Sequence, residues 1–203
     1  LVGAYLIGAV PFGLIIGKVF YGVDVREHGS GNFGTTNVFR VLGKRAGFVV
    51  LICDMAKGFV PALIAVLLFH PSLAIFIAAA PEVGLMYSIF LKGSGGKGVA
   101  TGAGILLALV PAIFLICLLV WLALLMTTRY VSVASLTAAV LVPVLAFLLD
   151  EPGAYKVAAV LVMIIVVSAH RGNIRRLLNG TENRANLPWT GSGSTPQSYG
   201  GGT

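Results

Sequence analysis

Long apolar runs separated by short polar segments dominate the chain. Runs with very few charged residues cover positions 1–20, 47–69, 72–91, 99–126, 131–149 and 154–169. Because a helix needs about 20 apolar residues to cross the hydrocarbon core of a bilayer, each run predicts a membrane-spanning helix. Run 99–126 exceeds one crossing and contains Val110-Pro111, where proline can end a helix. It predicts two shorter helices, so we expect an all-α polytopic membrane protein with about seven helices, one or two of them short or re-entrant.

The composition excludes a water-soluble globular protein. Hydrophobic residues make up 58% of the chain and charged residues 10%, whereas soluble domains carry about 25% charged residues. Lipid is therefore the expected solvent and partner. We expect residues 1–185 to form a single transmembrane domain. Residues 186–203 are rich in glycine and serine, and this composition favours a disordered tail.

The distribution of positive charge predicts the orientation in the membrane. The net charge is +7. The first polar segment carries four basic residues, Arg26, Arg40, Lys44 and Arg45, whereas the next connection, His70-Pro71, carries none. Since cytoplasmic loops are enriched in lysine and arginine, we expect the N-terminus outside and, with seven helices, the C-terminus in the cytoplasm. The basic residues are spread over several loops, so nucleic acid is not expected as a partner.

The first polar segment contains a run suited to anions, HGSGNFGTTNVFR at 28–40. Its glycines, hydroxyls and amides offer many donors to phosphate oxygens, and an arginine can add two parallel hydrogen bonds. The candidate phosphate ligands are Gly31, Asn32, Thr36, Asn37 and Arg40. The alternative is an ordinary loop at the membrane surface.

A second glycine-rich segment, GSGGKGVAT at 93–101, leads directly into an apolar helix. Glycine lets main-chain amides approach an anion, the helix N-terminus adds positive potential, and Lys97 adds a full charge. The spacing differs from a Walker A loop, because Gly98 stands where serine or threonine is required. The candidate ligands are Gly95, Gly96, Gly98 and Thr101. The alternative is a flexible turn with a snorkelling lysine.

A third polar segment, HRGNIRRLLNGTE at 170–182, follows the last apolar run. At helical spacing His170 and Asn173 lie near one face and can point at one ligand. Arg175 and Arg176 are interpreted as charges that contact lipid phosphate or substrate, or that simply mark the cytoplasmic boundary.

Charged residues inside the apolar runs need partners. Asp54 and Lys57 lie three residues apart, so they are expected to pair on one helix face, and Glu82 is a further ionisable residue in a run. Cys53 and Cys117 are interpreted as packing residues, and no metal-binding cluster is predicted.

The three polar segments, together with AVPFG at 9–13 and DMAKG at 54–58, resemble the bacterial glycerol-3-phosphate acyltransferases of the acyl-phosphate-dependent type (PlsY). The resemblance spans roughly residues 1–182. It implies transfer of a fatty acyl group from acyl-phosphate to the first hydroxyl of sn-glycerol 3-phosphate, without a cofactor, on the cytoplasmic side of the bacterial inner membrane. It also implies catalytic roles for Ser30, Lys97, His170 and Asn173, and substrate contacts for Arg171 and Glu182.

The chain departs from similar proteins at two places. Leu85 follows Gly84 where a histidine is usual, and Gly93-Ser94 replaces a common Phe-Lys pair. Because acyl-phosphate is already activated, positioning and charge neutralisation could suffice for transfer, with a substrate phosphate as proton acceptor. His170 is then a phosphate donor or a general base.

Two other functions fit the sequence less well. A CDP-alcohol phosphotransferase needs clustered aspartates for a divalent metal, whereas Asp24, Asp54 and Asp150 are far apart in the sequence. A transporter for phosphorylated solutes favours broken helices and charged groups at mid-membrane, whereas the glycine segments are predicted at one surface.

Overall fold

The computed structural model describes residues 1–91 and 95–185, and this part of the chain folds into helices joined by short connections. The helices are α1 (Val2–Ala9), α2 (Phe12–Tyr21), η1 (Val25–Glu27), α3 (Thr35–Leu42), α4 (Lys44–Leu68), α5 (Pro71–Met86), η2 (Ile89–Leu91), α6 (Val99–Leu109), α7 (Pro111–Thr128), α8 (Val131–Leu148), α9 (Gly153–Ala169) and α10 (Arg171–Leu178). The tail predicted at 186–203 lies outside the described residues.

The helices confirm a polytopic membrane protein. Four segments are long and apolar enough to cross a bilayer: α4, α5 with η2, α7 and α8. Two bent pairs can each form one further span, α1 with α2 at 43° and α9 with α10 at 56°. With the shorter apolar helix α6, the described residues agree with the prediction of about seven helices, of which one or two are short or re-entrant.

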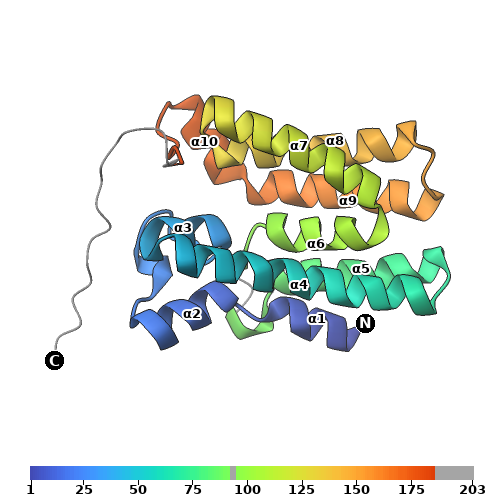
Figure 1. Cartoon of the computed structure of the whole chain (residues 1–203), viewed down its shortest axis with the longest axis horizontal. Coiled ribbons are helices and arrows are strands. Elements are labelled where there is room, and N and C mark those ends of the chain that lie inside the picture. Colours follow the sequence, from blue (N-terminus) through green and yellow to red (C-terminus); the bar gives the residue numbers. More distant parts are fainter. Residues whose placement is uncertain (92–94, 186–203) are drawn as a thin grey trace.

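The predicted break at Val110-Pro111 is present. Helix α6 ends at Leu109 and α7 begins at Pro111, where a missing N–H costs no intrahelical hydrogen bond. Val110 between them has φ −142° and ψ 70°, outside the helical region. The break lets α7 run back along the bundle beside α6 (Figure 1), so run 99–126 forms two helices, as predicted.

The bundle has two groups of helices with α6 between them (Figure 1). Helices α7, α8 and α9 pack together on one side, whereas α1, α4 and α5 pack on the other. The contact between α4 and α6 is especially close, because a Cβ at Gly58 would overlap the Thr101 carbonyl and one at Gly104 would overlap the Met55 carbonyl. Small residues at such crossings let membrane helices approach closely.

The outer surface of the bundle suits a lipid environment. Large apolar side chains such as Leu67, Leu119 and Leu148 are exposed along the candidate spans. A buried apolar cluster that includes Val25, Phe33 and Val38 lies under the first polar segment instead. The three polar segments gather at one end, where α3, α10 and the N-terminal end of α6 lie (Figure 1).

Candidate active site

Asn37 organises the first polar segment. It lies in the first turn of α3 and is buried. Its Nδ2 donates hydrogen bonds to the carbonyls of Val25 (2.8 Å) and His28 (3.1 Å), and its Oδ1 accepts one from the N–H of Ser30 (2.8 Å). The predicted phosphate ligand therefore has its amide committed to the loop, and we assign it a positioning role. The bond at position 30 uses the backbone, so it does not consume the Ser30 hydroxyl.

The other residues of this segment lie around its outer side. The Asn32 Oδ1 accepts a hydrogen bond from the N–H of Gly34 (2.8 Å), which tightens the turn before α3. Gly31 has φ +72°, a left-handed conformation that favours glycine. Thr36 is exposed in the first turn of α3. Arg40 is exposed one turn later, and its Nη1 lies 3.4 Å from the Asn37 Oδ1.

The glycines of the second segment pack against the end of α5. The N–H of Gly96 donates to the Leu85 carbonyl (3.1 Å), and a Cβ at Gly95 would overlap the Met86 carbonyl. Leu85, which replaces the usual histidine, is buried and contacts Gly96. Part of the role of these glycines is therefore close packing. The second departure, Gly93-Ser94, lies outside the described residues.

The start of α6 is anchored to α4. Gly98 caps the helix with φ +82°, and Thr101 in the first turn is fully buried. The Thr101 Oγ1 donates a hydrogen bond to the Asp54 carbonyl (3.0 Å). This hydroxyl, predicted as a phosphate ligand, instead holds the two helices together, because it is buried and already bonded.

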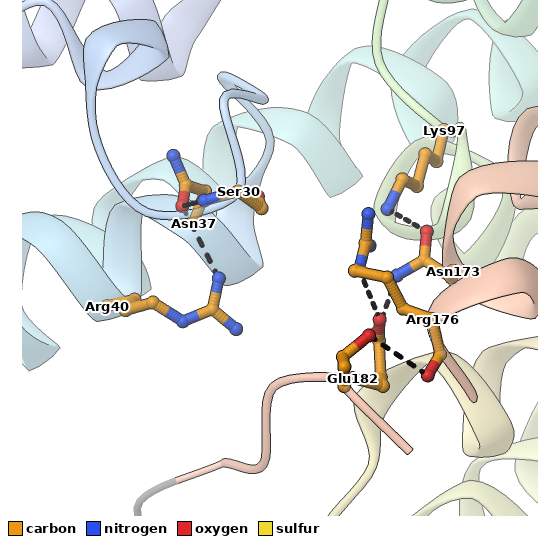
Figure 2. A network of polar contacts seen from close by, with 8 residues as sticks. Ser30, Asn37, Arg40, Lys97, Asn173, Arg176 and Glu182 are labelled. Atoms are coloured by element: carbon orange, nitrogen blue, oxygen red, sulfur yellow. Dashed lines mark hydrogen bonds and ion pairs between the residues drawn. The ribbon is translucent and has the colours of Figure 1, made fainter. Parts of the chain in front are cut away.

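A chain of polar contacts connects the second and third segments (Figure 2). The Lys97 Nζ donates to the Asn173 Oδ1 (2.5 Å), and the Asn173 Nδ2 donates to the Glu182 Oε1 (2.6 Å). The Arg176 Nε then donates to the Glu182 Oε2 (2.7 Å). Asn173 can link an ammonium to a carboxylate because its amide carries both an acceptor and a donor. Glu182 therefore orients other side chains in this structure, whereas the sequence predicted that it contacts substrate.

Arg176 belongs to this network, which favours its interpretation as a residue of the site over that of a charge that only marks the membrane boundary. It forms an ion pair with Glu182, and its side chain is 35% exposed. The helical periodicity contained the necessary signal, because Arg176 lies three residues after Asn173 and therefore on the same side of α10. Its partner is not predictable in this way, since Glu182 follows the end of the helix.

His170 caps α9 one turn before Asn173 and is buried. Its Nδ1 lies 2.8 Å from the Val166 carbonyl. Because a carbonyl oxygen only accepts, Nδ1 carries the hydrogen in this contact. The Nε2 nitrogen of the neutral ring is then an acceptor, and it can donate to a phosphate only when the ring is protonated.

The charges around this network favour an anionic ligand. Lys97, Arg176 and Arg40 contribute three positive charges that interact with the single carboxylate of Glu182. Burial lowers the pKa of Lys97, and the like charge of Arg176 lowers it further. Figure 2 shows the Arg40 guanidinium directed toward the side on which the Lys97 network lies. A bound phosphate would relieve this repulsion.

A cavity of about 650 Å³ adjoins Lys97. Its polar lining residues include Asn32, Lys97, Arg171 and Arg175, and apolar residues line it as well. The latter include Met86, Tyr87, Ile165 and Ala169. This lining suits a molecule with an anionic group and an apolar chain. Among residues 1–91 and 95–185, no three His, Cys, Asp or Glu side chains are grouped as metal ligands.

The chain is similar to known enzymes over most of its length. Residues 1–180 match the family model described as glycerol-3-phosphate acyltransferase. A glycerol-3-phosphate acyltransferase of Bacillus cytotoxicus is 47% identical over 190 residues, which are 92% of this chain and 94% of that protein. Glycerol-3-phosphate acyltransferase 2 of Bacillus cereus is 45% identical over 187 residues, 91% of this chain and 92% of its own.

Solved structures show the same arrangement of helices. The crystal structure of PlsY, an integral membrane glycerol 3-phosphate acyltransferase in its glycerol 3-phosphate form, superposes with a TM-score of 0.88 at 42% identity. The match covers 91% of this chain and 93% of that one. A lysophosphatidic acid form of PlsY gives a TM-score of 0.85. The family model, the relatives and the fold agree, and this chain belongs to the glycerol-3-phosphate acyltransferase family.

Proposed function

We propose that the protein transfers a fatty acyl group from acyl-phosphate to the 1-hydroxyl of sn-glycerol 3-phosphate. The products are lysophosphatidic acid and inorganic phosphate, and the reaction is the first acylation in phospholipid synthesis. Family membership supports this function, as does the description of solved PlsY structures in glycerol 3-phosphate and lysophosphatidic acid forms. The observation that carries it is the surplus of positive charge at a cavity that apolar residues line as well.

The two substrates divide this site in our proposal. The acceptor phosphate binds between Arg40 and the Lys97 network, where cations outnumber the carboxylate. The donor phosphate binds in the cavity, near Asn32, Arg171 and Gly95. The acyl chain then lies along the apolar residues that line the cavity, Met86, Tyr87 and Ile165. Lys97 belongs to both regions, so it lies where the two substrates meet.

The reaction balances without a covalent enzyme intermediate. The acceptor hydroxyl oxygen attacks the acyl carbonyl carbon, a new ester bond forms, and the bond from that carbon to the phosphate oxygen breaks. The departing phosphate takes up the hydroxyl proton. Negative charge shifts toward the leaving phosphate during this step, and Lys97 is suited to stabilise it. Ser30 and His170 orient the substrates, with the neutral His170 ring accepting a hydrogen bond from a substrate hydroxyl at Nε2, and Asn173 orients Lys97.

The proposed site lies on the cytoplasmic side of the bacterial inner membrane. The support is the grouping of α3, α10 and the start of α6 at one end of the bundle (Figure 1), together with the basic residues of these segments. Cytoplasmic connections are enriched in such residues. Activated acyl groups and glycerol 3-phosphate made in the cytoplasm would reach the site directly.

Product formation by the purified protein tests the function. We expect lysophosphatidic acid from acyl-phosphate and glycerol 3-phosphate, with undiminished turnover in a metal chelator. Robust turnover with acyl-CoA alone would contradict the proposed donor. Complete loss of activity in chelator would favour a metal-dependent phosphotransferase, and flux of glycerol 3-phosphate into sealed vesicles without product would favour a transporter.

A further inference from the structure

Three buried ionisable side chains lie next to the site without belonging to it. Asp54 and Lys57 are on α4, Glu82 is on α5, and each is at most 4% exposed. Both helices are candidate membrane spans, where charged groups are costly and usually paired or functional. Their contacts lead to the segments that carry the site.

Lys57 holds the break between α1 and α2. Its Nζ lies 2.8 Å from the Asp54 Oδ1, which confirms the ion pair expected from their spacing. The same Nζ donates a hydrogen bond to the Val10 carbonyl (3.1 Å) where the first span bends, and this carbonyl also accepts one from the N–H of Phe12 (3.2 Å). Broken membrane helices need such partners for their backbone. The contact fixes the position at which α2 departs toward the first polar segment.

Asp54 contacts the first turn of α3, which follows the first polar segment, and the first turn of α6, which follows the second glycine-rich segment. The Thr35 Oγ1, at the start of α3, lies 3.4 Å from the Asp54 Oδ2. The Thr101 Oγ1, in the first turn of α6, bonds the Asp54 carbonyl at 3.0 Å. One turn of α4 therefore anchors the ends of both segments.

Glu82, on α5, lies against the second glycine-rich segment at Gly98. Its Oε1 lies where a Cβ of Gly98 would be, and neither carboxylate oxygen has a hydrogen-bond partner among the described residues. Any other residue at 98 would collide with Glu82 and would also need the left-handed φ of +82°. The residue that precedes Gly98 is Lys97, so Glu82 limits where the lysine can lie.

We propose that Asp54, Lys57 and Glu82 are positioning residues that set the spacing between the first glycine segment and Lys97. An apolar pair of similar volume could fill the same space on α4 equally well, so packing alone does not explain the side-chain contacts of Lys57 with Val10 and of Asp54 with Thr35. The inference rests on the proposed function in one respect. The distance between the first segment and Lys97 is proposed to separate the two substrates during acyl transfer.

A double variant separates positioning from folding. Asp54→Leu with Lys57→Met removes both members of the ion pair together, so neither is left as the unpaired half of that pair, and we expect the melting temperature to change little. We expect kcat to fall about a hundredfold, with both KM values changing less than about threefold, because small misplacements of reacting groups are costly. Ser135→Ala removes a partly buried hydrogen bond from Trp121 between α7 and α8 and is the matched control, with kcat unchanged.

The distance between two spin labels tests the positioning role without any acyl donor. Spin labels at Glu27 and Phe90, which are both exposed beside the two segments, are introduced with Cys53→Ala and Cys117→Ala. We expect the distance distribution to broaden or shift in the double variant. An unchanged distribution would overturn the proposal. If the unaltered protein does not use acyl-phosphate, the proposed function fails, while this measurement still decides the positioning role.

Single substitutions test the proposal if the double variant does not fold. Thr35→Val keeps the volume and removes only the contact with the Asp54 carboxylate, and we expect kcat to fall about tenfold with a broadened distribution. Glu82→Ala, which opens space beside Gly98, is expected to cost a similar factor, whereas Glu82→Gln keeps the shape and stays within about threefold. Full activity and unchanged distances in both Thr35→Val and Glu82→Ala would refute the proposal.

Discussion

Lys97 donates a hydrogen bond of 2.5 Å to the Asn173 side chain, although 76 positions separate the two residues. The bond joins the glycine segment before α6 to helix α10 at the other end of the chain. Because Asn173 is also bonded to Glu182, the lysine is connected to a carboxylate only through an amide. Its charge is oriented without being directly neutralised, which suits a side chain that binds phosphate.

Loss of the Lys97 charge should impair the transfer step. We expect Lys97→Ala to lower kcat about a hundredfold or more, the scale of removing one transition-state charge donor. Lys97→Arg should recover little, since a planar guanidinium does not replace a compact ammonium beside packed glycines. Arg45→Ala, an exposed basic residue at the start of α4, is the control. Near-full activity of correctly inserted Lys97→Ala would exclude this residue from the site.

Loss of the Arg176 side chain should lower activity, although this side chain is partly exposed. Arg176→Ala removes the partner that orients Glu182, and Glu182 in turn orients Asn173. We expect kcat/KM for glycerol 3-phosphate to fall about tenfold, which corresponds to about 1.4 kcal/mol. Arg176→Lys should recover part of this loss, because it retains the charge. An Arg176→Ala protein as active as the Arg45→Ala control would show that the network is not needed.

The alkaline dependence of activity should report on Lys97. Burial and Arg176 lower the lysine pKa in the empty site, so the protonated form is lost as pH rises through this lowered value. A bound phosphate raises the pKa again. The alkaline limb of kcat/KM, which reflects the free enzyme, should therefore lie at lower pH than the limb of kcat. Coincident limbs, or an unshifted limb in the residual activity of Lys97→Arg, would contradict this assignment.

The orientation in the membrane can be tested with single cysteines in a background lacking Cys53 and Cys117. Glu27→Cys and Asn179→Cys lie near the site end of the bundle and should react with an impermeant thiol reagent only in inverted vesicles. Asp150→Cys, in the exposed connection after α8, should react in intact cells. Labelling of Asn179→Cys from outside would place the C-terminal segment on the opposite side and contradict the seven-helix topology.

Much of the fold could be predicted from the sequence, because it depends on interactions within one turn or one span. Apolar runs of sufficient length can satisfy their backbone in lipid only as helices, and Pro111 removes the N–H that would continue α6. The Asp54–Lys57 pair follows from helical spacing alone. The three polar segments contained enough residues of the right kinds to indicate the family and the chemistry.

Which atoms these residues present to a ligand was decided by the tertiary structure. Asn37 and Thr101 are polar residues in the expected segments, yet their side chains are used within the protein because buried donors and acceptors must be paired. Arg176 gained a role from Glu182, a residue beyond its own helix. Spacing along a helix specifies a shared face, but it does not specify what packs against that face, since contacts such as Lys97 with Asn173 depend on how distant helices pack.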